Sequence, residues 1–265
     1  MTLTERSRIS IALIVLYTPA FFIAIFLTIR HGLGRSSGWR FVLTFTLARL
    51  LACAFQLRTI AEPTNLSLYI GEWVLLGIAL SPLELTSLGF LSRVVASINK
   101  RHATLLTPRH IRLVQLLNTA ALGLAVGGGV QAGNAAGSGG AIRAPTLTKV
   151  AVALFIATFA CVVVGALATW RSVRYAEEGE KRLLVTIAAT SPFLLVRVVY
   201  TAMSCYSGRS EFNPVTGKVG LLLGMAFVME LVIVYAFEAV GLTLKKIVKE
   251  PDGERSVEMT PKATA

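Results

Sequence analysis

The chain has 265 residues, of which 54% are hydrophobic and only 15% are charged, and its mean hydropathy is +0.68. A soluble domain of this size does not tolerate such a composition, so we expect a membrane protein. The net charge of +12 could suggest a nucleic-acid partner. We expect none, because the basic residues are distributed as topology signals are in membrane proteins.

Seven stretches are apolar over about 20 residues, the length that a helix needs to cross a bilayer. In chain order they cover residues 9–29, 40–57, 66–92, 112–130, 150–170, 183–203 and 219–242. The pattern predicts an all-α fold, a seven-transmembrane helix bundle that forms one domain over residues 1–244. A polar, disordered cytosolic tail is expected at 245–265.

Basic residues alternate between the two predicted sides of the membrane. Seven lie on the side of the N-terminus and seventeen on the side of the C-terminus, when those inside spans are left out. By the positive-inside rule the N-terminus is lumenal or outside and the C-terminus is cytosolic. We expect a multi-pass protein, with the endoplasmic reticulum as its location. The sequon at Asn65 lies on the predicted lumenal side, so glycosylation there is weakly indicated.

Glycine patterns suggest both a linker and helix contacts. The stretch "VGGGVQAGNAAGSGG" (126–140) is typical of a flexible connection between the fourth and fifth spans. Gly123 with Gly127, and Gly220 with Gly224, have the spacing at which small residues let membrane helices approach closely. We interpret both pairs as packing positions within the bundle.

Six ionisable side chains lie inside the predicted spans, where an isolated charge costs several kcal/mol, roughly 3 on insertion scales. They are, in chain order, Arg49, Glu72, Glu84, Arg197, Glu230 and Glu238. At ~1.5 Å of rise per residue, four of them share the lumenal half of the membrane. We expect Arg197 to pair with Glu72, and Arg49 with Glu230. Such a network can fix helix register or line a polar cavity.

Glu84 and Glu238 are placed near the cytosolic boundary by the same count of residues. There they can extend toward water and toward basic side chains of the cytosolic loops. The arginines within reach in this interpretation are Arg171, Arg174 and Arg182.

Aromatic residues flank the lumenal-half charges: Tyr69, Trp73, Phe193, Tyr200 and Tyr235. At helical spacing they pack against neighbouring helices or line a cavity whose ring faces stabilise a carbocation. A glutamate in such an apolar cavity can serve as a general acid. Glu230 and Glu72 are therefore the candidate catalytic residues, with Arg197 and Arg49 as their charge partners.

Several kinds of site are not expected. Asp252, in the tail, is the chain's single aspartate, so no aspartate-rich motif can hold magnesium on a diphosphate. The three histidines fall on the predicted cytosolic side, which disfavours an intramembrane haem or zinc site. We expect no metal and no cofactor.

Three stretches carry a family resemblance: "SPLELTSLGFLSRV" (81–94), "SPFLLVRVVYT" (191–201) and "FVMELVIVYAFEAVGLTL" (227–244). With seven spans, they resemble a fungal family of integral membrane proteins that includes the membrane-bound terpene cyclases of ascochlorin- and macrophorin-type meroterpenoid pathways. By this resemblance Arg49, Arg197, Tyr200 and Glu230 fall on family positions. Glu84 stands where an aliphatic residue is expected.

The resemblance implies a metal-independent cyclase. Such enzymes protonate a terminal epoxide or olefin of a farnesyl chain on an aromatic core and guide its cyclisation. The substrate would be a hydrophobic prenylated small molecule that enters from the lipid bilayer. Two alternatives remain, a seven-helix receptor and a small transporter with an intramembrane network of glutamates and arginines.

Overall fold

The computed structural model describes residues 4–32, 38–102, 104, 106–137, 144–215 and 217–244, and every regular element in these ranges is helical. Seven helical spans are long and apolar enough to cross a membrane, which confirms the predicted all-α seven-helix bundle. The elements are α1 (Glu5–His31), α2 (Trp39–Arg58), α3 (Leu66–Ile78), α4 (Leu80–Asn99), α5 (Pro108–Gly137), α6 (Thr146–Trp170), η1 (Val173–Tyr175), α7 (Glu178–Tyr206), η2 (Ser210–Phe212), α8 (Val219–Leu222), η3 (Leu223–Val228) and α9 (Met229–Thr243). The predicted tail at 245–265 lies outside the described residues.

The third span consists of two helices, α3 and α4, that meet at Ala79. Pro82 explains the interruption, because its ring clashes with the carbonyl group of Ile78 and it has no N–H to donate to that group. Helix α4 continues to Asn99, beyond the end of the predicted span at 66–92. This difference changes the depth at which its charged residues lie.

The last span is also irregular. Between α8 and α9 the chain forms six residues of π-helix, η3. A π-helical turn is rare and is found often at functional sites. It ends directly before α9, whose second residue is Glu230.

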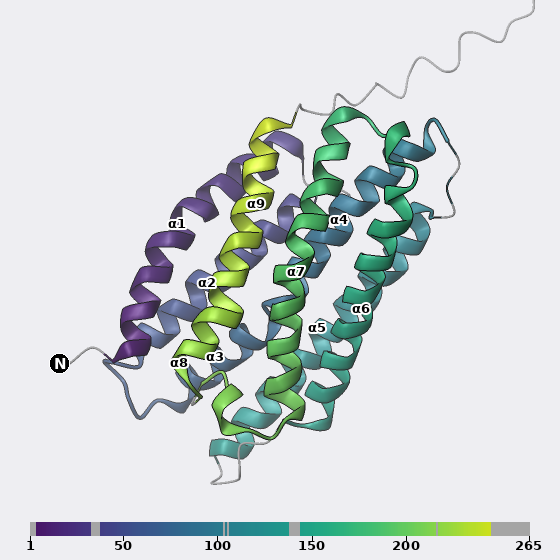
Figure 1. Cartoon of the computed structure of the whole chain (residues 1–265). Helices are drawn as coiled ribbons and strands as arrows, with labels where there is room; N and C mark the ends of the chain where they lie inside the picture. Colours follow the sequence, from purple (N-terminus) through teal and green to yellow (C-terminus); the bar gives the residue numbers. More distant parts are fainter. Residues whose placement is uncertain are drawn as a thin grey trace, which may run out of the picture.

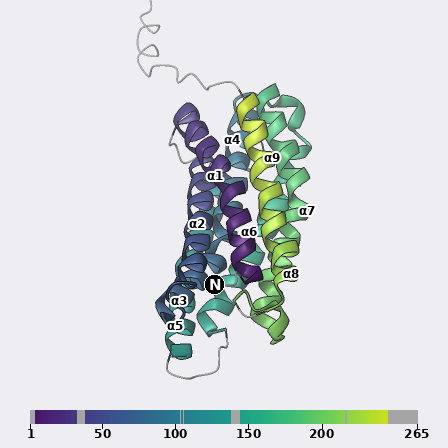
Figure 2. The same ribbon diagram turned by 90° about the vertical axis from the view of Figure 1, so that its left-hand side faces the viewer.

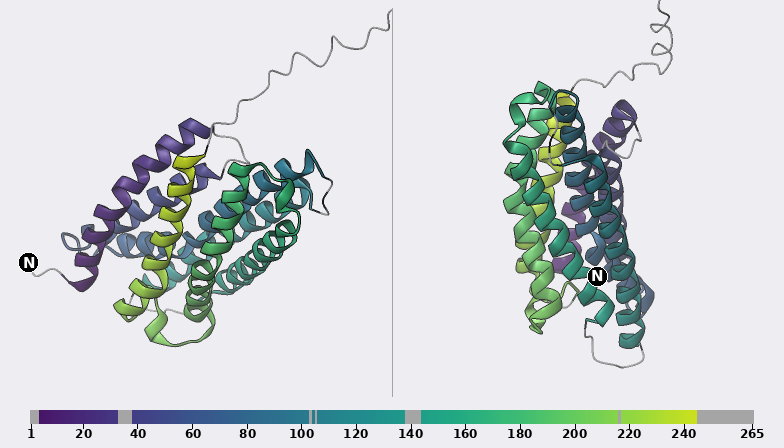
Figure 3. Two further views of the ribbon diagram at one scale, coloured as in Figure 1. Left: turned by 45° about the horizontal axis from the view of Figure 1, so that its top comes forward. Right: turned by 90° about the vertical axis from the view of Figure 1, so that its right-hand side faces the viewer.

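Helix α4 lies at the centre of the bundle. It contacts α2, α5, α6 and α7, and most of its side chains are buried, polar ones included. Helix α1 lies at an edge, beside α2 and α9 (Figure 1). In the view of Figure 2, α2, α3 and α5 lie on one side and α7 and α9 on the other. The left view of Figure 3 also shows α1, in purple, at the edge. A helix in the centre contacts protein on all sides, which lets α4 carry polar groups.

Helix α5 continues through most of the glycine-rich stretch that was predicted to be a linker. It ends at Gly137, so that prediction is wrong for residues 126–137. A Cβ atom at Gly133 would lie 2.5 Å from Ile70 of α3, and one at Gly128 would lie 2.3 Å from Thr148 of α6. The glycines therefore let α3 and α6 pack close to α5, and this packing offsets their low helix propensity.

The predicted GxxxG contacts are wrong. A Cβ atom at Gly123, Gly220 or Gly224 would meet no atom within 4 Å, and one at Gly127 would be in ordinary contact with Leu147 at 3.9 Å. The close approaches on α5 occur instead at Gly128 and Gly133, which face in other directions. Sequence spacing identifies small residues but not the direction in which each faces.

The first and last helices are joined at the end of the bundle where both finish. Arg30 of α1 donates hydrogen bonds to the carbonyl groups of Leu242, at 3.3 Å, and Leu244, at 3.2 Å. The last carbonyls of a helix have no partner within it, and a cation there also interacts favourably with the helix dipole. We call this end, where α2 and α5 begin, the distal end, and the other the proximal end. The distal end is the one predicted to be cytosolic.

Candidate functional site

Three charged side chains from three helices meet inside the bundle. Glu230 of α9 accepts hydrogen bonds at one oxygen, Oε1, from Arg49 of α2 and from Nε of Arg197 of α7, the latter at 2.6 Å. Their exposed fractions are 0%, 1% and 3%, respectively. We call these residues the ion triad. One carboxylate between two guanidinium groups leaves the triad with a net charge of +1.

Arg197 is held by further hydrogen bonds. Its Nη2 atom donates to the carbonyl oxygen of Leu76 at 3.1 Å, and its Nη1 atom donates to the hydroxyl group of Thr201. The Leu76 carbonyl lies near the end of α3, where the interruption before Pro82 leaves carbonyl groups without helical partners. The broken span thus supplies a backbone acceptor, and a negative helix end, to a buried arginine.

Apart from Glu230, Arg49 contacts aromatic rings. Its guanidinium carbon lies 5.1 Å from the ring centre of Phe227, in the π-helical segment, and 5.6 Å from that of Phe45. Ring faces attract cations, and more strongly where water is absent. Its Nε and Nη1 atoms are buried without a hydrogen-bond partner among the described residues. Arg49 is therefore less completely bound than Arg197.

The structure corrects one of the two predicted ion pairs. Arg49 does contact Glu230, but Arg197 contacts Glu230 as well and forms no ion pair with Glu72. Glu72, 5% exposed, faces Gln56 of α2. With its amide nitrogen toward the carboxylate, Gln56 donates to both oxygens at 2.8 and 2.9 Å. Arg197 and Glu72 were predicted to pair because they have similar depths in the membrane. Whether two residues of equal depth meet also depends on the direction in which each faces around its helix.

Glu72 lies close to an open cleft at the proximal end. The cleft has a volume of about 540 Å³, and its lining includes Gln56, Tyr69 and Arg6. Arg6 is near enough to Glu72 for the two charges to interact. Its guanidinium group is held by the carbonyl oxygens of Pro214, at 2.8 Å, and Gly217, at 2.9 Å. Gln56, the hydrogen-bond donor to Glu72, lines this cleft, so the cleft is one side chain away from the Glu72 carboxyl group.

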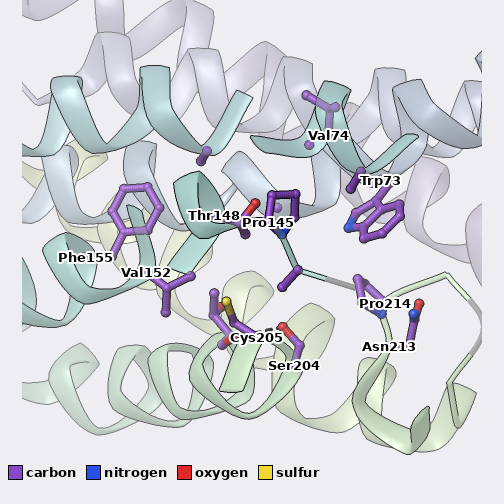
Figure 4. Close-up of a pocket in the computed structure, with 16 residues that line it drawn as sticks. Trp73, Val74, Pro145, Thr148, Val152, Phe155, Ser204, Cys205, Asn213 and Pro214 are labelled. Atoms are coloured by element: carbon purple, nitrogen blue, oxygen red, sulfur yellow. Dashed lines mark hydrogen bonds between the residues drawn. The ribbon is translucent and has the colours of Figure 1, made fainter. Parts of the chain in front are cut away.

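The residue after Glu72, Trp73, lines a second cavity. Trp73, Thr148 and Ser204 surround a pocket of about 100 Å³ (Figure 4). Thr201 also lines it, and it is the residue that accepts a hydrogen bond from Arg197. The pocket is thus one side chain away from the ion triad and one residue away from Glu72.

The remaining predicted aromatic residues are dispersed. Tyr200 is buried, and the Arg197 guanidinium carbon lies 5.7 Å from its ring centre. Tyr69 lines the proximal cleft, with its hydroxyl group 3.3 Å from the Pro63 carbonyl. Phe193 packs against the core, and Tyr235 donates to the Leu16 carbonyl of α1 at 2.7 Å. The predicted set of five does not form one cavity.

The predicted location of Glu84 and Glu238 near water is wrong. Glu84 is 0% exposed and Glu238 is 1% exposed. The three arginines proposed as their partners are exposed side chains, and the ion pairs of the described residues include none of them with either glutamate. Because α4 continues to Asn99, Glu84 lies about 22 Å from its distal end, at 1.5 Å per residue, too deep to reach water.

Glu84 belongs to a polar cluster between α4 and α5 that the sequence analysis missed. Asn118 donates to one of its oxygens, and Ser81 donates to Asn118, both at 2.5 Å. Asn118 and Ser81 are each 0% exposed. A buried amide in a span is a signal that could have been used, since it demands polar partners.

A second buried ion pair was also missed. Arg93 of α4 is 7% exposed and Glu180 of α7 is 5% exposed, and the Arg93 Nε atom lies 2.8 Å from a Glu180 oxygen. Both residues fall outside the predicted spans at 66–92 and 183–203. The longer helices observed bring them inside the bundle near its distal end.

Asn65 begins α3 as its N-terminal cap. Its side-chain oxygen accepts from the Ser67 N–H at 3.2 Å, and its nitrogen donates to Glu62 at 2.9 Å. This hydrogen bond, together with the Arg58 guanidinium group, lowers the pKa of the surface residue Glu62. The nitrogen that a glycan would occupy is engaged in the folded protein.

The geometry points to proton chemistry or charge recognition within the membrane. Among the described residues, no three histidine, cysteine, aspartate or glutamate side chains gather as metal ligands. Four glutamates, Glu84, Glu180, Glu230 and Glu238, each have at least one buried oxygen without a hydrogen-bond partner among the described residues. Glu72 differs from them, because both of its oxygens accept hydrogen bonds from the neutral Gln56 amide.

The comparisons with known proteins identify the family. A family described as Domain of unknown function (DUF7702) matches residues 3–247. The chain belongs to this family. No curated protein and no solved structure matches the chain. The family match covers all the helices described above, including the ion triad and both cavities.

Proposed function

We propose that the protein is a membrane-bound, metal-independent terpene cyclase, of the fungal meroterpenoid type and located in the endoplasmic reticulum, in which Glu72 is the proton donor. One observation carries the choice of residue. Glu72 is buried beside an open cleft and next to a pocket, and its hydrogen-bond donor is a neutral amide. A carboxyl group without a bound cation can hold a proton in an apolar setting and deliver it.

The proposed step conserves atoms and electrons. Glu72 gives its proton to the oxygen of a terminal epoxide, the carbon–oxygen bond breaks as the next double bond attacks that carbon, and a ring forms. The resulting carbocation loses a proton to water or to the Glu72 carboxylate, so the product is an isomer of the substrate. The Trp73 ring lines the pocket where such a cation would be stabilised.

The ion triad has a different role in this proposal. Glu230 is the shared acceptor of two guanidinium groups, so in this proposal it acts as their counter-ion and not as the acid. Arg197 instead fixes Thr201, which lines the pocket. Glu230, Arg197 and Arg49 are therefore positioning residues, and Glu72 is the catalytic residue.

The pocket must enlarge to admit a substrate of this kind. Its volume of about 100 Å³ is well below the roughly 300 Å³ at which sites for drug-sized ligands begin. Gly77 of α3 and Gly129 of α5 both line the pocket, so neither helix places a side chain in it at these positions. We expect α3 and α5 to separate when a prenylated aromatic molecule enters.

Microsomes that contain the protein, incubated with farnesylated phenols with and without a terminal epoxide, test this function. The expected result is a product of unchanged mass, formed by the wild type and by Glu62→Gln and lost in Glu72→Gln. Glu62 is a matched control, because it is a surface glutamate just before α3. Full turnover by Glu72→Gln would overturn the assignment of Glu72. Absence of any isomer with every prenylated phenol would overturn the cyclase.

A proton-coupled carrier is the second candidate. It is favoured by two buried carboxyl groups in the third span, since Glu72 and Glu84 lie about 18 Å apart along this broken span. Such rows form proton relays in transporters. Proteoliposomes that acidify when a hydrophobic solute is added, with loss of the signal in both Glu72→Gln and Glu84→Gln, would favour the carrier. The cyclase predicts no such flux.

A further inference from the structure

A groove between α2, α4 and α5 shares no lining residue with the cleft and the pocket described above. Its volume is about 290 Å³. Arg40 of α2 and Arg112 of α5 lie at one end of the groove, and apolar side chains continue from there. The groove is lined by Arg40, Phe41, Thr44, Pro82, Leu85, Arg112, Gln115, Leu116, Thr119 and Leu122.

The two arginines mark the level of the lipid headgroups. Arg40 is the second residue of α2 and Arg112 the fifth of α5, and both helices begin at the distal end (Figure 1). Arg112 is exposed. Arg40 is half-buried, with its guanidinium carbon 4.5 Å from the ring centre of Phe41. Two guanidinium groups at this depth can bind one phosphate group.

The rest of the groove suits an acyl chain. Leu122 lies ten residues after Arg112, about 15 Å deeper at the helical rise, which is half the thickness of a bilayer core. The threonine hydroxyl groups along it donate to their own helices, Thr44 to the Arg40 carbonyl and Thr119 to the Gln115 carbonyl, both at 2.8 Å. They therefore present little unsatisfied polarity to a hydrocarbon chain.

We propose that this groove binds an anionic glycerophospholipid of the distal leaflet, with its phosphate group between Arg40 and Arg112 and one acyl chain along Leu85, Leu116 and Leu122. Charge complementarity at one end and an apolar path of leaflet depth beyond it favour a lipid over a free anion, which would use the arginines alone. By the predicted orientation this is the cytosolic leaflet, where anionic lipids are enriched.

Lipid binding to the purified full-length protein in detergent tests the proposal. Native mass spectrometry is used to titrate phosphatidylserine, phosphatidylcholine and inorganic phosphate separately. We expect phosphatidylserine to bind more tightly than phosphatidylcholine, and Arg112→Gln to weaken it about fivefold, with about 25-fold for the double change with Arg40→Gln. Arg109→Gln is the matched control, because this exposed arginine is on the same helix end but outside the groove.

A steric variant separates the groove from general surface charge. Thr119→Trp places a ring in the apolar part without altering charge, and it should weaken phosphatidylserine binding while the protein remains monodisperse. Equal affinity for the two lipids, or an equal loss in Arg109→Gln and Arg112→Gln, would overturn the proposal. Inorganic phosphate that binds with the same dependence on both arginines would replace the lipid by a free anion and would also overturn it.

Discussion

Glu230 and Glu72 are both buried glutamates, but their surroundings differ in kind. Glu230 is fully enclosed and shares one oxygen between two arginines. Glu72 is 5% exposed, is held by a neutral amide and lies beside a cleft. The first is a counter-ion whose removal leaves buried positive charge, and the second is a carboxyl group that can exchange a proton. The same residue type thus serves stability in one place and chemistry in the other.

The largest expected effect tests the role of Glu230 as a counter-ion. Glu230→Gln leaves two buried guanidinium groups without a carboxylate, which should lower stability by roughly 3–5 kcal/mol. Thermal unfolding in detergent, together with accumulation in membranes, measures this. The double variant Glu230→Gln with Arg49→Met restores the wild-type charge of +1 and should recover part of the loss. No recovery would show that charge balance is not what Glu230 provides.

The two arginines should differ from one another. Arg197→Met removes the hydrogen bonds to the Leu76 carbonyl and to Thr201 in addition to the ion pair. Arg49→Met leaves a neutral Arg197–Glu230 pair. It also removes two buried nitrogens that have no hydrogen-bond partner among the described residues. We expect Arg197→Met to be less stable than Arg49→Met by roughly 1–3 kcal/mol, since it leaves buried acceptors unsatisfied. Equal unfolding midpoints would contradict this ranking.

Helix packing around Glu72 gives a third prediction. Gly133→Leu should cost about 1–3 kcal/mol by overpacking, because a Cβ atom there already meets Ile70 at 2.5 Å. Gly123→Ala is the matched change on the same helix, where a Cβ atom meets nothing within 4 Å, and it should be neutral or slightly stabilising. The comparison fails if both variants unfold at the same temperature.

Glu72→Gln should affect stability least among the buried changes, by less than about 1 kcal/mol, because an amide has a similar shape and can accept from Gln56. Activity should nevertheless be lost, as described above. A large loss of stability with residual activity would contradict this prediction, because Glu72 would then serve stability, as Glu230 is expected to do.

Glu62→Gln should change stability least of all these variants, and its effect should depend on pH. The pKa of Glu62 is lowered by Asn65 and Arg58, so its ionised form stabilises the fold above its unfolded pKa, and this contribution is lost as the pH falls through the folded pKa. The variant should be slightly less stable than the wild type at neutral pH and equal to it in acid. A difference that persists in acid would mean that Glu62 acts through shape and not through charge.

Hydropathy and charge distribution were enough to predict seven spans and to find the residues of the ion triad, because an apolar span and a buried charge are both local properties of the sequence. The partner of Arg197 could not be predicted, since residues at equal depth on different helices meet only if they face one another. The break at Pro82 and the extension of α4 to Asn99 displaced Glu84 from the boundary to the interior. The glycine-rich stretch was misassigned because tertiary packing overrides helix propensity.

The three residues of the ion triad are synthesised in a fixed order. Arg49 and Arg197 lie on the second and sixth spans, whereas Glu230 lies on the seventh. During synthesis both cations enter the membrane before the residue that neutralises them has left the ribosome. The two arginines of the nascent chain therefore have no counter-ion until its last helix inserts. Insertion of that helix supplies the Glu230 carboxylate and completes the helix packing. A chain that stops short of Glu230 would present two uncompensated arginines to the quality-control machinery.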